Sequence, residues 1–364
     1  MKVVFPSSFY IMNNKQREKE LAYWEKVTSC FPLSTIVRDE ILAYAKRLIN
    51  NNTAVIFSLS HLALLLGIKV ATLKGLINAT SSYYYSFKIP KKSGGYREIS
   101  APYPVLLSVQ KWIYNNILNK IKLNDHAKGF IKRMSIKDNA SMHLNTSRVL
   151  KMDIKNFFPS IRLNRVMSVF LNLGYTNKIA YYLSALCCLN ERLPQGAATS
   201  PCLSNIIAKR LDARLTGLST MLSLNYTRYA DDLTFSGDIL PPKFIKYVTK
   251  IVKEEGFIIN RSKTHLISKG CQKIITGISI SSGVLKIPRE KRREVRKDIY
   301  YLLKNGIFEH LKHKQSFDPI YVERLLGFLF FWKSIEPNNS FVISSIQKLK
   351  KYAEQLDSTT FSVS

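Results

Sequence analysis

Two adjacent carboxylates, Asp231 and Asp232, end the run Tyr-Ala-Asp-Asp at 229–232, and this spacing could support metal chemistry. Residues 222–226 before the run and 233–235 after it are typical of strands, so a tight hairpin would hold both aspartates at its tip. Adjacent carboxylates repel, and the pair stays ionised only beside a cation or in water. The pair therefore predicts a metal site, and the alternative is a solvated Asp-Asp turn.

A third carboxylate, Asp153, ends a mostly apolar stretch, 149–154, that predicts a buried strand. A carboxylate there is costly to bury without a cation. Together with Asp231 and Asp232 it could hold two Mg²⁺ ions, one lowering the pKa of an attacking hydroxyl and one binding a triphosphate and its leaving pyrophosphate. Mg²⁺ keeps waters and substrate phosphates, so two or three carboxylates suffice. The cluster lacks the His and Cys ligands of a zinc hydrolase.

Other residues around these aspartates are suited to nucleotide contacts. In the loop 193–201 (LPQGAATSP), Gly196 leaves the backbone free to lie close to a substrate, and Gln195 can hydrogen-bond a base edge or a sugar. Phe158 could stack on a nucleotide sugar or fill the core. Lys263 could meet a phosphate or be an ordinary solvated lysine.

The charge of the chain indicates a polyanionic partner. Lys and Arg number 55 against 25 Asp and Glu, so the net charge is +30, and the excess is spread along 364 residues. Nucleic acid is the first choice of partner, and a membrane surface is second because no segment is typical of an amphipathic anchor. With 46% apolar residues, the chain is long enough for two or three packed units.

Cysteine usage and the N-terminus fit a protein of a reducing cytoplasm. The five cysteines are odd in number and show no CxxC spacing, which disfavours a zinc site or a disulfide framework. Residues 1–2 lead into no signal-peptide core. The most apolar run, 54–68, is shorter than the ~20 residues of a spanning helix and predicts a buried helix instead.

The elements that must position these residues can be outlined from pattern. A hairpin over 87–102 turns at Ser93-Gly94-Gly95 and presents basic side chains. Residues 59–77 have the spacing of a helix-turn-helix, and the alternative is a helical pair packed on the next unit. Further helices are expected at 106–121, 163–188 (broken at Gly174), 202–215, 241–255 and from 289 onward, and short strands at 257–260, 264–267, 273–280 and 284–287.

The ordered set of motifs resembles the fingers and palm of reverse transcriptases. It comprises Arg97 in a basic hairpin, 151–161 (KMDIKNFFPSI), 193–201, 229–232 and 256–264 (GFIINRSKT). The resemblance implies an α+β right-hand polymerase fold whose palm has an antiparallel sheet. The implied units are an N-terminal helical extension, 1–58; fingers, 59–150; a palm, 151–287, with finger helices 161–190 inserted; and a helical thumb, 288–364.

The resemblance also assigns roles to single residues. Asp153, Asp231 and Asp232 match the catalytic metal ligands, and the carbonyl of Ile154 assists them. Phe158 matches the steric gate that excludes a ribose 2′-OH and so favours dNTPs.

The remaining matches concern the incoming nucleotide. Gln195 and Gly196 match the loop that shapes the nucleotide pocket. Arg97 and Lys92 match the triphosphate clamp, and Lys263 matches a lysine near the leaving group.

Two further segments narrow the family. Residues 139–143 (NASMH) resemble the NAxxH segment of retron reverse transcriptases, and Ile275-Thr276-Gly277 resembles their VTG segment. The resemblance implies that such an enzyme recognises a cognate structured RNA and copies part of it into multicopy single-stranded DNA. Synthesis would start from a 2′-OH, leave DNA joined to RNA, and serve anti-phage defence with a separate effector protein.

Residues that would bind the RNA follow from these segments and from the predicted thumb. Candidates are Asn139, His143, Thr276, Gly277, Arg289, Arg292, Arg293 and Arg296. Basic side chains on a helix can track phosphates without reading sequence. The structural alternatives are that Asn139 caps a turn, that His143 is a satisfied core histidine, and that Thr276-Gly277 only ends a strand.

Several related classes remain as alternatives. A group II intron reverse transcriptase would carry a maturase region after the thumb, for which little of the given chain remains. Diversity-generating and abortive-infection polymerases share the palm, but residues 139–143 favour a retron. A catalytically silent RNA-binding scaffold is a different class, and the complete Asp triad argues against it, because three carboxylates without metal would repel nucleic acid.

Overall fold

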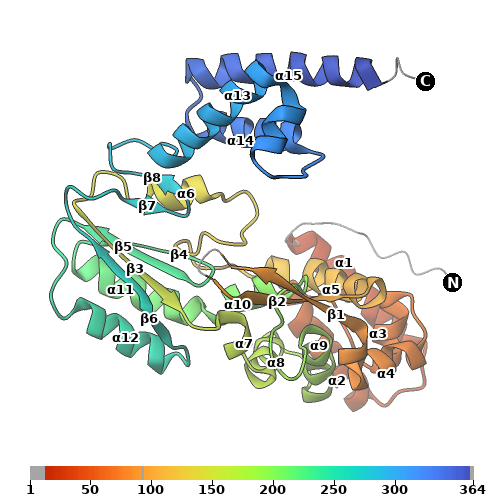
Figure 1. The fold of residues 1–364 in the computed structure, drawn as a ribbon. Coiled ribbons are helices and arrows are strands. Elements are labelled where there is room, and N and C mark those ends of the chain that lie inside the picture. The colour runs from red at the N-terminus through yellow and green to blue at the C-terminus, as the bar shows by residue number, and fades with distance from the viewer. Residues whose placement is uncertain (1–12, 92–93, 361–364) are drawn as a thin grey trace.

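The computed structural model, which describes residues 13–91 and 94–360, centres on a four-stranded antiparallel sheet (Figure 1). Its order is β4-β5-β3-β6, with β3 at Arg148–Ile154, β4 at Asn225–Tyr229, β5 at Asp232–Gly237 and β6 at Ile259–Ile267. The sequence predicted two short strands where β6 runs as one. A right-hand polymerase palm is expected to have such a sheet, and the topology agrees with this expectation.

Helices cover one face of this sheet. Helix α11 (Lys209–Met221) packs on β4 and α12 (Phe244–Glu254) packs on β6, as Figure 1 shows. In α12 the side chains of Phe244, Val248 and Val252 recur every four residues and are buried, so one stripe of the helix faces the sheet. The helix predicted over 202–215 is divided at Ala208 into α10 (Ser200–Ile207) and α11.

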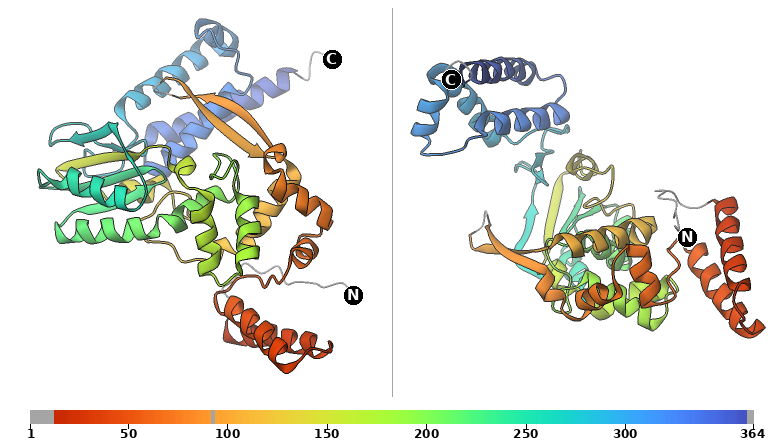
Figure 2. Two further views of the ribbon diagram at one scale, coloured as in Figure 1. Left: turned by 90° about the horizontal axis from the view of Figure 1, so that it is seen from below. Right: turned by 90° about the vertical axis from the view of Figure 1, so that its right-hand side faces the viewer.

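The fingers combine a long hairpin with helices from two separate parts of the sequence. Strands β1 (Tyr84–Pro90) and β2 (Tyr96–Pro102) form the predicted hairpin. The helices of the fingers are α3 (Leu59–Leu66), α4 (Val70–Asn78), α5 (Pro104–Asn116), α7 (Phe157–Ser160), α8 (Leu163–Asn172) and α9 (Asn177–Cys187), and α5 packs on β2. Helix α9 contacts α4 and α5, so helices from two separate parts of the sequence pack together there (Figure 2).

The N-terminal helices α1 (Asn14–Ser29) and α2 (Thr35–Asn50) pack on each other and join the same core through Trp24 and Leu48. Helices α3 and α4 meet at an angle of 106° across Gly67, which has a left-handed φ of 66°.

The buried side chains of α3 and α4 agree with the alternative that residues 59–77 form a helical pair packed on the next unit. Leu62, Leu73 and Leu76 are all fully buried. No single helix among the described residues is long and apolar enough to cross a membrane. Helices α3 and α4 have sufficient length and apolar composition only when they are taken together, and they are sharply bent at Gly67.

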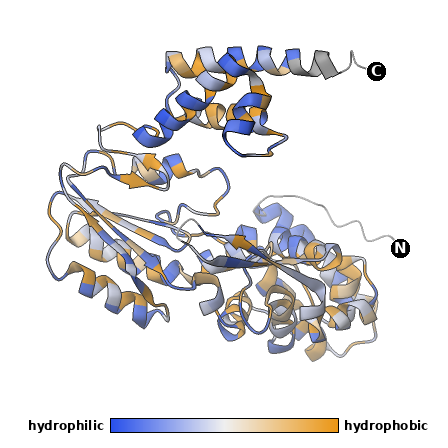
Figure 3. Ribbon diagram, viewed as in Figure 1, coloured by the Kyte–Doolittle hydropathy of each residue, from blue (hydrophilic) through white to orange (hydrophobic). Residues whose placement is uncertain are grey.

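A second hydrophobic core holds the thumb helices α13 (Arg289–His313, kinked at Gly306), α14 (Tyr321–Ile335) and α15 (Ser340–Thr360). Strands β7 (Ile274–Ile275) and β8 (Ile278–Ser279) and helix α6 (Ile136–Ser141) contribute to it. The β7–β8 hairpin is largely coloured as hydrophobic in Figure 3. Part of the stretch that the sequence assigned to the palm therefore shares its core with the thumb.

Candidate active site

The loop of the β4–β5 hairpin consists of Ala230 and Asp231, because Tyr229 pairs with Asp232 across the two strands. Ala230 has φ of 57°, in the left-handed region that costs an L-residue about 1–2 kcal/mol. A positive φ at the first central residue is typical of a type II′ turn, which usually has Gly there. The predicted tight hairpin with both aspartates at its tip is confirmed.

Asp153 lies beside this turn, on the neighbouring strand. It pairs in register with Asp232 of β5, and the backbone N–H of Ile154 donates to the carbonyl of Asp231 at 2.9 Å. The structure thus brings the three aspartates predicted from sequence to one end of the palm sheet.

Burial and mutual repulsion oppose ionisation of the two turn carboxyls. Burial raises the pKa of Asp231, and the charge of Asp153 raises it further. Burial, followed by the charge of Asp231, raises the pKa of Asp232 to about 6. Asp153 is 6% exposed. Carboxylates crowded in this way are stabilised by a cation brought among them.

Lys263 supplies one such cation. Its Nζ donates to Oδ2 of Asp153 at 2.8 Å, and the hydrogen bond raises the pKa of the ammonium. The lysine is on β6, next to β3, and its side chain is 53% exposed, so it borders the cluster from the solvent side. Sequence predicted a phosphate contact for Lys263, and the structure pairs it with a carboxylate.

The donor set of this cluster suits a hard divalent cation, since every candidate ligand is an oxygen. Among residues 13–91 and 94–360, no three His, Cys, Asp or Glu side chains are already arranged to hold a metal ion. Mg²⁺ normally keeps several waters and takes substrate phosphates as ligands, so a complete protein cage is not required. The crowded carboxylates, with an ammonium already among them, fit an ion of this kind.

Arg97 reaches the site from the fingers. It lies on the exposed part of β2, paired with Ile89 of β1, and its charge lowers the pKa of Asp231. Its cation therefore lies within electrostatic reach of the carboxylates. Lys92, the other predicted clamp residue, lies outside the described residues.

The loop at Gly196 packs against the fingers hairpin. The N–H of Ser100 donates to the carbonyl of Gln195 at 2.7 Å, and a Cβ added at Gly196 would lie 2.6 Å from the carbonyl oxygen of Ser100. Gly196 also has φ of 124°, which other residues rarely adopt. The sequence predicted close approach to a substrate, and the close approach found here is to the strand β2.

Phe158 lies at the border between core and site. It is half-buried, and its ring contacts those of Phe157 (centroids 5.5 Å apart) and Phe130 (5.9 Å). Phe130 in turn contacts Tyr229 of the Asp-Asp hairpin at 6.4 Å. Phe157 is buried against Phe257 and belongs to the core, whereas the neighbouring Phe158 borders the site.

The two retron-like segments touch each other. The Nδ2 of Asn139 donates to Oγ1 of Thr276 at 3.3 Å, and that hydroxyl donates to the carbonyl of Ile136 at 3.3 Å. Thr276 and Gly277 both have positive φ, which is the pattern of a type I′ hairpin turn between β7 and β8. Asn139 is 1% exposed, so its contacts are with the protein.

His143 is completely buried against the two palm strands β4 and β5. Its Nδ1 lies 2.7 Å from Oγ of Ser236, and its Nε2 lies 2.8 Å from Oγ1 of Thr227. Burial lowers the pKa of the imidazole to about 3. This geometry agrees with the alternative that His143 is a satisfied core histidine. The neutral ring fixes the segment 139–143 to the sheet.

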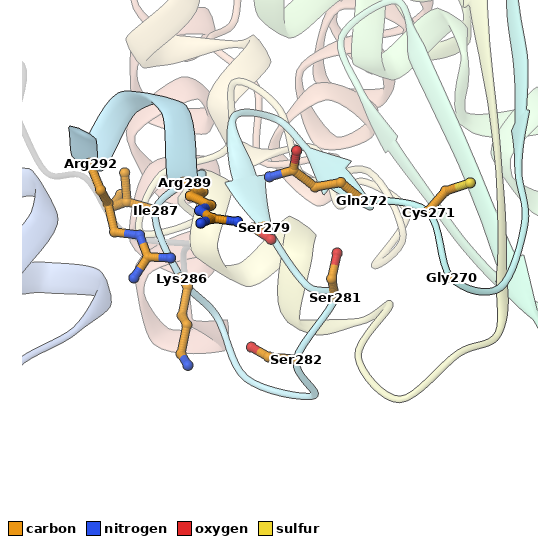
Figure 4. Close-up of a pocket in the computed structure, with 10 residues that line it drawn as sticks. All are labelled: Gly270, Cys271, Gln272, Ser279, Ser281, Ser282, Lys286, Ile287, Arg289 and Arg292. Carbon is orange, nitrogen blue, oxygen red and sulfur yellow. The ribbon is translucent and has the colours of Figure 1, made fainter. Parts of the chain in front are cut away.

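Basic residues line a pocket of about 340 Å³ where β8 leads into α13 (Figure 4). Lys286, Arg289 and Arg292 and the hydroxyls of Ser281 and Ser282 border it, with no acidic side chain in the lining.

The other two predicted RNA-binding arginines, Arg293 and Arg296, lie exposed on the same helix. The guanidinium of Arg296 lies over the ring of Phe341 at 4.6 Å. The start of the thumb therefore offers cations suited to phosphates.

Sequence reasoning missed a buried polar group under the Asp-Asp turn, formed by Arg228, Asp212 and Asn205. A signal was present: Arg228 continues the alternation of Leu224 and Tyr226 on one face of the predicted strand, so an arginine on that face requires a buried partner.

Comparison with known proteins agrees with this geometry. The family model described as reverse transcriptase (RNA-dependent DNA polymerase) matches residues 89–302. The Retron Ec86 reverse transcriptase of Escherichia coli is 36% identical over 278 residues, covering 74% of this chain and 87% of that protein. The Retron Mx65 reverse transcriptase of Myxococcus xanthus is 37% identical, covering 59% of this chain and 55% of that protein.

Among solved structures, telomerase from Candida albicans in complex with a fragment of telomeric RNA aligns with a TM-score of 0.42 at 10% identity, covering 73% of this chain and 63% of that one. The family assignment depends on the family model and on the retron relatives. The family works in general with a divalent metal, which the oxygen-rich cluster fits. The chain belongs to the retron reverse transcriptases, and it is an RNA-directed DNA polymerase.

Proposed function

We propose that this polymerase copies part of a cognate structured non-coding RNA into multicopy single-stranded DNA, starting from a 2′-OH so that the DNA stays joined to RNA. The observation that carries the proposal is the hydrogen bond between Asn139 and Thr276, because it joins the two segments that resemble retron reverse transcriptases in particular. The similarity to named retron enzymes supports the same assignment.

The chemistry is assigned to Asp153, Asp231 and Asp232 at the end of the palm sheet. Two bound Mg²⁺ ions would lower the pKa of the attacking hydroxyl and stabilise the charge that develops on the leaving pyrophosphate. The three carboxylates would hold these ions, with the carbonyl of Ile154 assisting. Lys263 from the palm and Arg97 from the fingers add positive charge near the cluster, which would favour a triphosphate there.

Selection of dNTPs is assigned to the groups that border this cluster. The ring of Phe158 contacts Phe130, which in turn contacts Tyr229. From this position Phe158 would block a ribose 2′-OH. Gln195 would contact the nucleotide from a loop that the hydrogen bond to Ser100 ties to the fingers hairpin. Lys92 completes the proposed triphosphate clamp.

Recognition of the RNA is assigned to the palm–thumb junction. Arg289 and Arg292 in the basic pocket, with Arg293 and Arg296 beside it, would bind phosphates of a structured RNA. Shape and 2′-OH contacts distinguish one folded RNA from another. Buried Asn139 and His143, with the Thr276-Gly277 turn, would serve this site by fixing the backbone on which it is built.

The biological setting we propose is the bacterial cytoplasm, where the template RNA is transcribed. There the RNA–DNA product would serve anti-phage defence together with a separate effector protein. The retron relatives favour this setting over a group II intron or an abortive-infection polymerase.

The test is to express this chain with its flanking genomic DNA and to examine the nucleic acid that co-purifies. A short single-stranded DNA whose size shifts after RNase and after debranching treatment is the expected result. If only unextended RNA co-purifies while the protein still extends a supplied primer on an RNA template, the retron role is contradicted and the polymerase assignment stands.

A further inference from the structure

A fully buried ion pair lies beneath the turn that carries Asp231 and Asp232. Arg228 on β4 and Asp212 on α11 are both 0% exposed. Two parallel hydrogen bonds join them, from Nε to Oδ1 at 2.7 Å and from Nη2 to Oδ2 at 2.6 Å. The hydroxyl of Tyr226 donates to the same Oδ1 at 2.9 Å. The guanidinium of Arg228 is therefore held in one orientation by Asp212 of α11.

The same guanidinium reaches the turn itself. Its Nη1 donates to the carbonyl of Ala230 at 3.1 Å and to Oδ1 of Asn205 at 3.0 Å. Ala230 is the left-handed residue of the turn, a conformation that is unfavourable for an L-residue. A hydrogen bond from a charged donor is stronger than one between neutral groups, and it offsets part of that cost. Arg228 thus stabilises the backbone conformation that presents the two aspartates.

Asn205 extends the contact to the other side of the turn. Its Nδ2 donates to the carbonyl of Gly129 at 2.9 Å. A Cβ added at Gly129 would lie 2.6 Å from the backbone N of Ala230, so this segment presses directly on the turn. The N–H of Lys128 also donates to the carbonyl of Arg228 at 2.7 Å. The turn is therefore enclosed between Arg228 and the segment at Gly129.

A role in stability alone does not explain this arrangement. Removing two charges from water offsets most of their attraction, and buried ion pairs can often be replaced by apolar residues without loss of stability. Arg214, also on α11, forms ion pairs with Glu254 and Glu255 at the end of α12, and its side chain is 33% exposed. The pair at Arg228 differs in that its guanidinium has a further N–H, which donates to the carbonyl of Ala230 between Tyr229 and Asp231.

We propose that Arg228, oriented by Asp212 and Asn205, is a positioning residue for nucleotidyl transfer. It fixes the carbonyl of Ala230 and so sets where Asp231 and Asp232 stand relative to Asp153. This inference rests on the proposed catalytic role of the aspartates.

The test compares three variants of the full chain: Arg228→Lys, Asn205→Ala and the double variant Arg228→Met/Asp212→Leu. The measurements are kcat and KM for dTTP on a poly(rA)–oligo(dT) template, binding of that template in EDTA, and thermal unfolding. A displacement of about 1 Å in a catalytic group can lower a rate about 100-fold, and we expect kcat to fall by that order in each variant. Template binding in EDTA does not depend on the turn and should change less than about threefold, and the loss in kcat should exceed any change in KM for dTTP.

The double variant separates positioning from stability, because apolar replacement of a buried pair can keep the unfolding temperature near that of wild type. Arg214→Met is the matched control and should keep wild-type kcat. A wild-type kcat in Asn205→Ala or in a stably folded double variant overturns the proposal. Asn205→Ala leaves the ion pair intact, so it decides the question alone if neither Arg228 variant folds.

Asp231→Asn is measured in the same assay to separate this inference from the proposed function. If Asp231→Asn is inactive while the Arg228 and Asn205 variants are active, only the positioning role fails. If Asp231→Asn keeps wild-type activity, the proposed catalytic assignment fails and the positioning role fails with it.

Discussion

The ammonium of Lys263 lies 2.8 Å from Oδ2 of Asp153, so a cation of the protein itself occupies one ligand of the carboxylate cluster. Asp153 is almost completely buried and Lys263 is half-exposed. The lysine can therefore leave toward solvent when another cation or a triphosphate enters. This relationship links the resting electrostatics of the site to its use of metal and nucleotide.

Replacing Lys263 with Gln should have opposite effects on metal binding and on catalysis. Without the ammonium, Asp153 has no competing partner, so Mg²⁺ should bind the nucleotide-free protein more tightly. Nucleotide incorporation should slow by about 10–100-fold, because the charge that we propose to act near the leaving group is lost. Calorimetry with Mg²⁺ and steady-state primer extension measure the two effects. Lys250→Gln, at an exposed surface pair, is the control, and weaker Mg²⁺ binding in Lys263→Gln would contradict the account.

The stability of the metal-free protein should depend on pH through Asp232. Its pKa is raised to about 6 in the fold, so between about pH 4 and pH 6 the folded state holds a proton that the unfolded state has lost. The free energy of unfolding therefore falls as the pH rises through this range. Asp232→Asn should be more stable than wild type at pH 7.5 in EDTA, by at most about 3 kcal/mol, and the gain should shrink toward pH 4.

Asp238→Asn is the matched control for this prediction, because its hydrogen bonds to Ser147 lower the pKa of Asp238. The sign is then reversed: Asp238 stabilises the fold above its unfolded pKa, so its replacement should lower stability at pH 7.5. Urea denaturation at several pH values measures both variants. Equal stability of Asp232→Asn and wild type at pH 7.5 would show that burial of this carboxyl costs nothing.

Replacing Phe158 with Ala should admit ribonucleotides. The ring is half-buried beside Phe130, so its removal opens space next to Tyr229. The ratio of kcat/KM for dTTP over UTP should fall by about 100-fold, since a steric gate works by exclusion. Phe308→Ala, at an exposed ring in the thumb, is the control. Unchanged selectivity in Phe158→Ala would remove the gate assignment.

Replacing Gly196 with Ala should impair both folding and synthesis. The new Cβ would lie 2.6 Å from the backbone oxygen of Ser100, and φ of 124° is unfavourable for Ala by about 1–2 kcal/mol. Gly217→Ala is the matched control, because Gly217 is helical and has nothing within 4 Å of the added atom. That control should gain about 0.5–1 kcal/mol. Denaturant unfolding of both variants checks the prediction, and an undisturbed Gly196→Ala would contradict the close packing of the loop on β2.

Local patterns in the sequence predicted the parts of the fold that depend on local chemistry. The alternation and turn residues of 87–102 predicted the fingers hairpin, and the run at 229–232 predicted the turn with its two aspartates. The polar residues Arg261 and Ser262 interrupt the apolar pattern of β6, so the sequence indicated two strands where there is one.

The partners of buried polar groups could not be predicted in the same way. Asp212 and Asn205 come from helices 16 and 23 residues before Arg228, and only the packing of α10 and α11 on the sheet brings them together. The partner of Gly196 is likewise a strand almost 100 residues away. Tertiary packing decides such contacts, and a periodic pattern carries no record of them.

The most direct test of the central claim is to purify wild-type protein and the Asp231→Asn/Asp232→Asn variant after expression with the flanking genomic DNA. We expect wild type to carry a branched RNA–DNA molecule and the variant to carry the same RNA without DNA, because RNA binding is assigned to the thumb and its junction with the palm. DNA on the variant would contradict the assignment of the aspartates to polymerisation. Loss of the RNA from the variant would contradict the separation of the two sites.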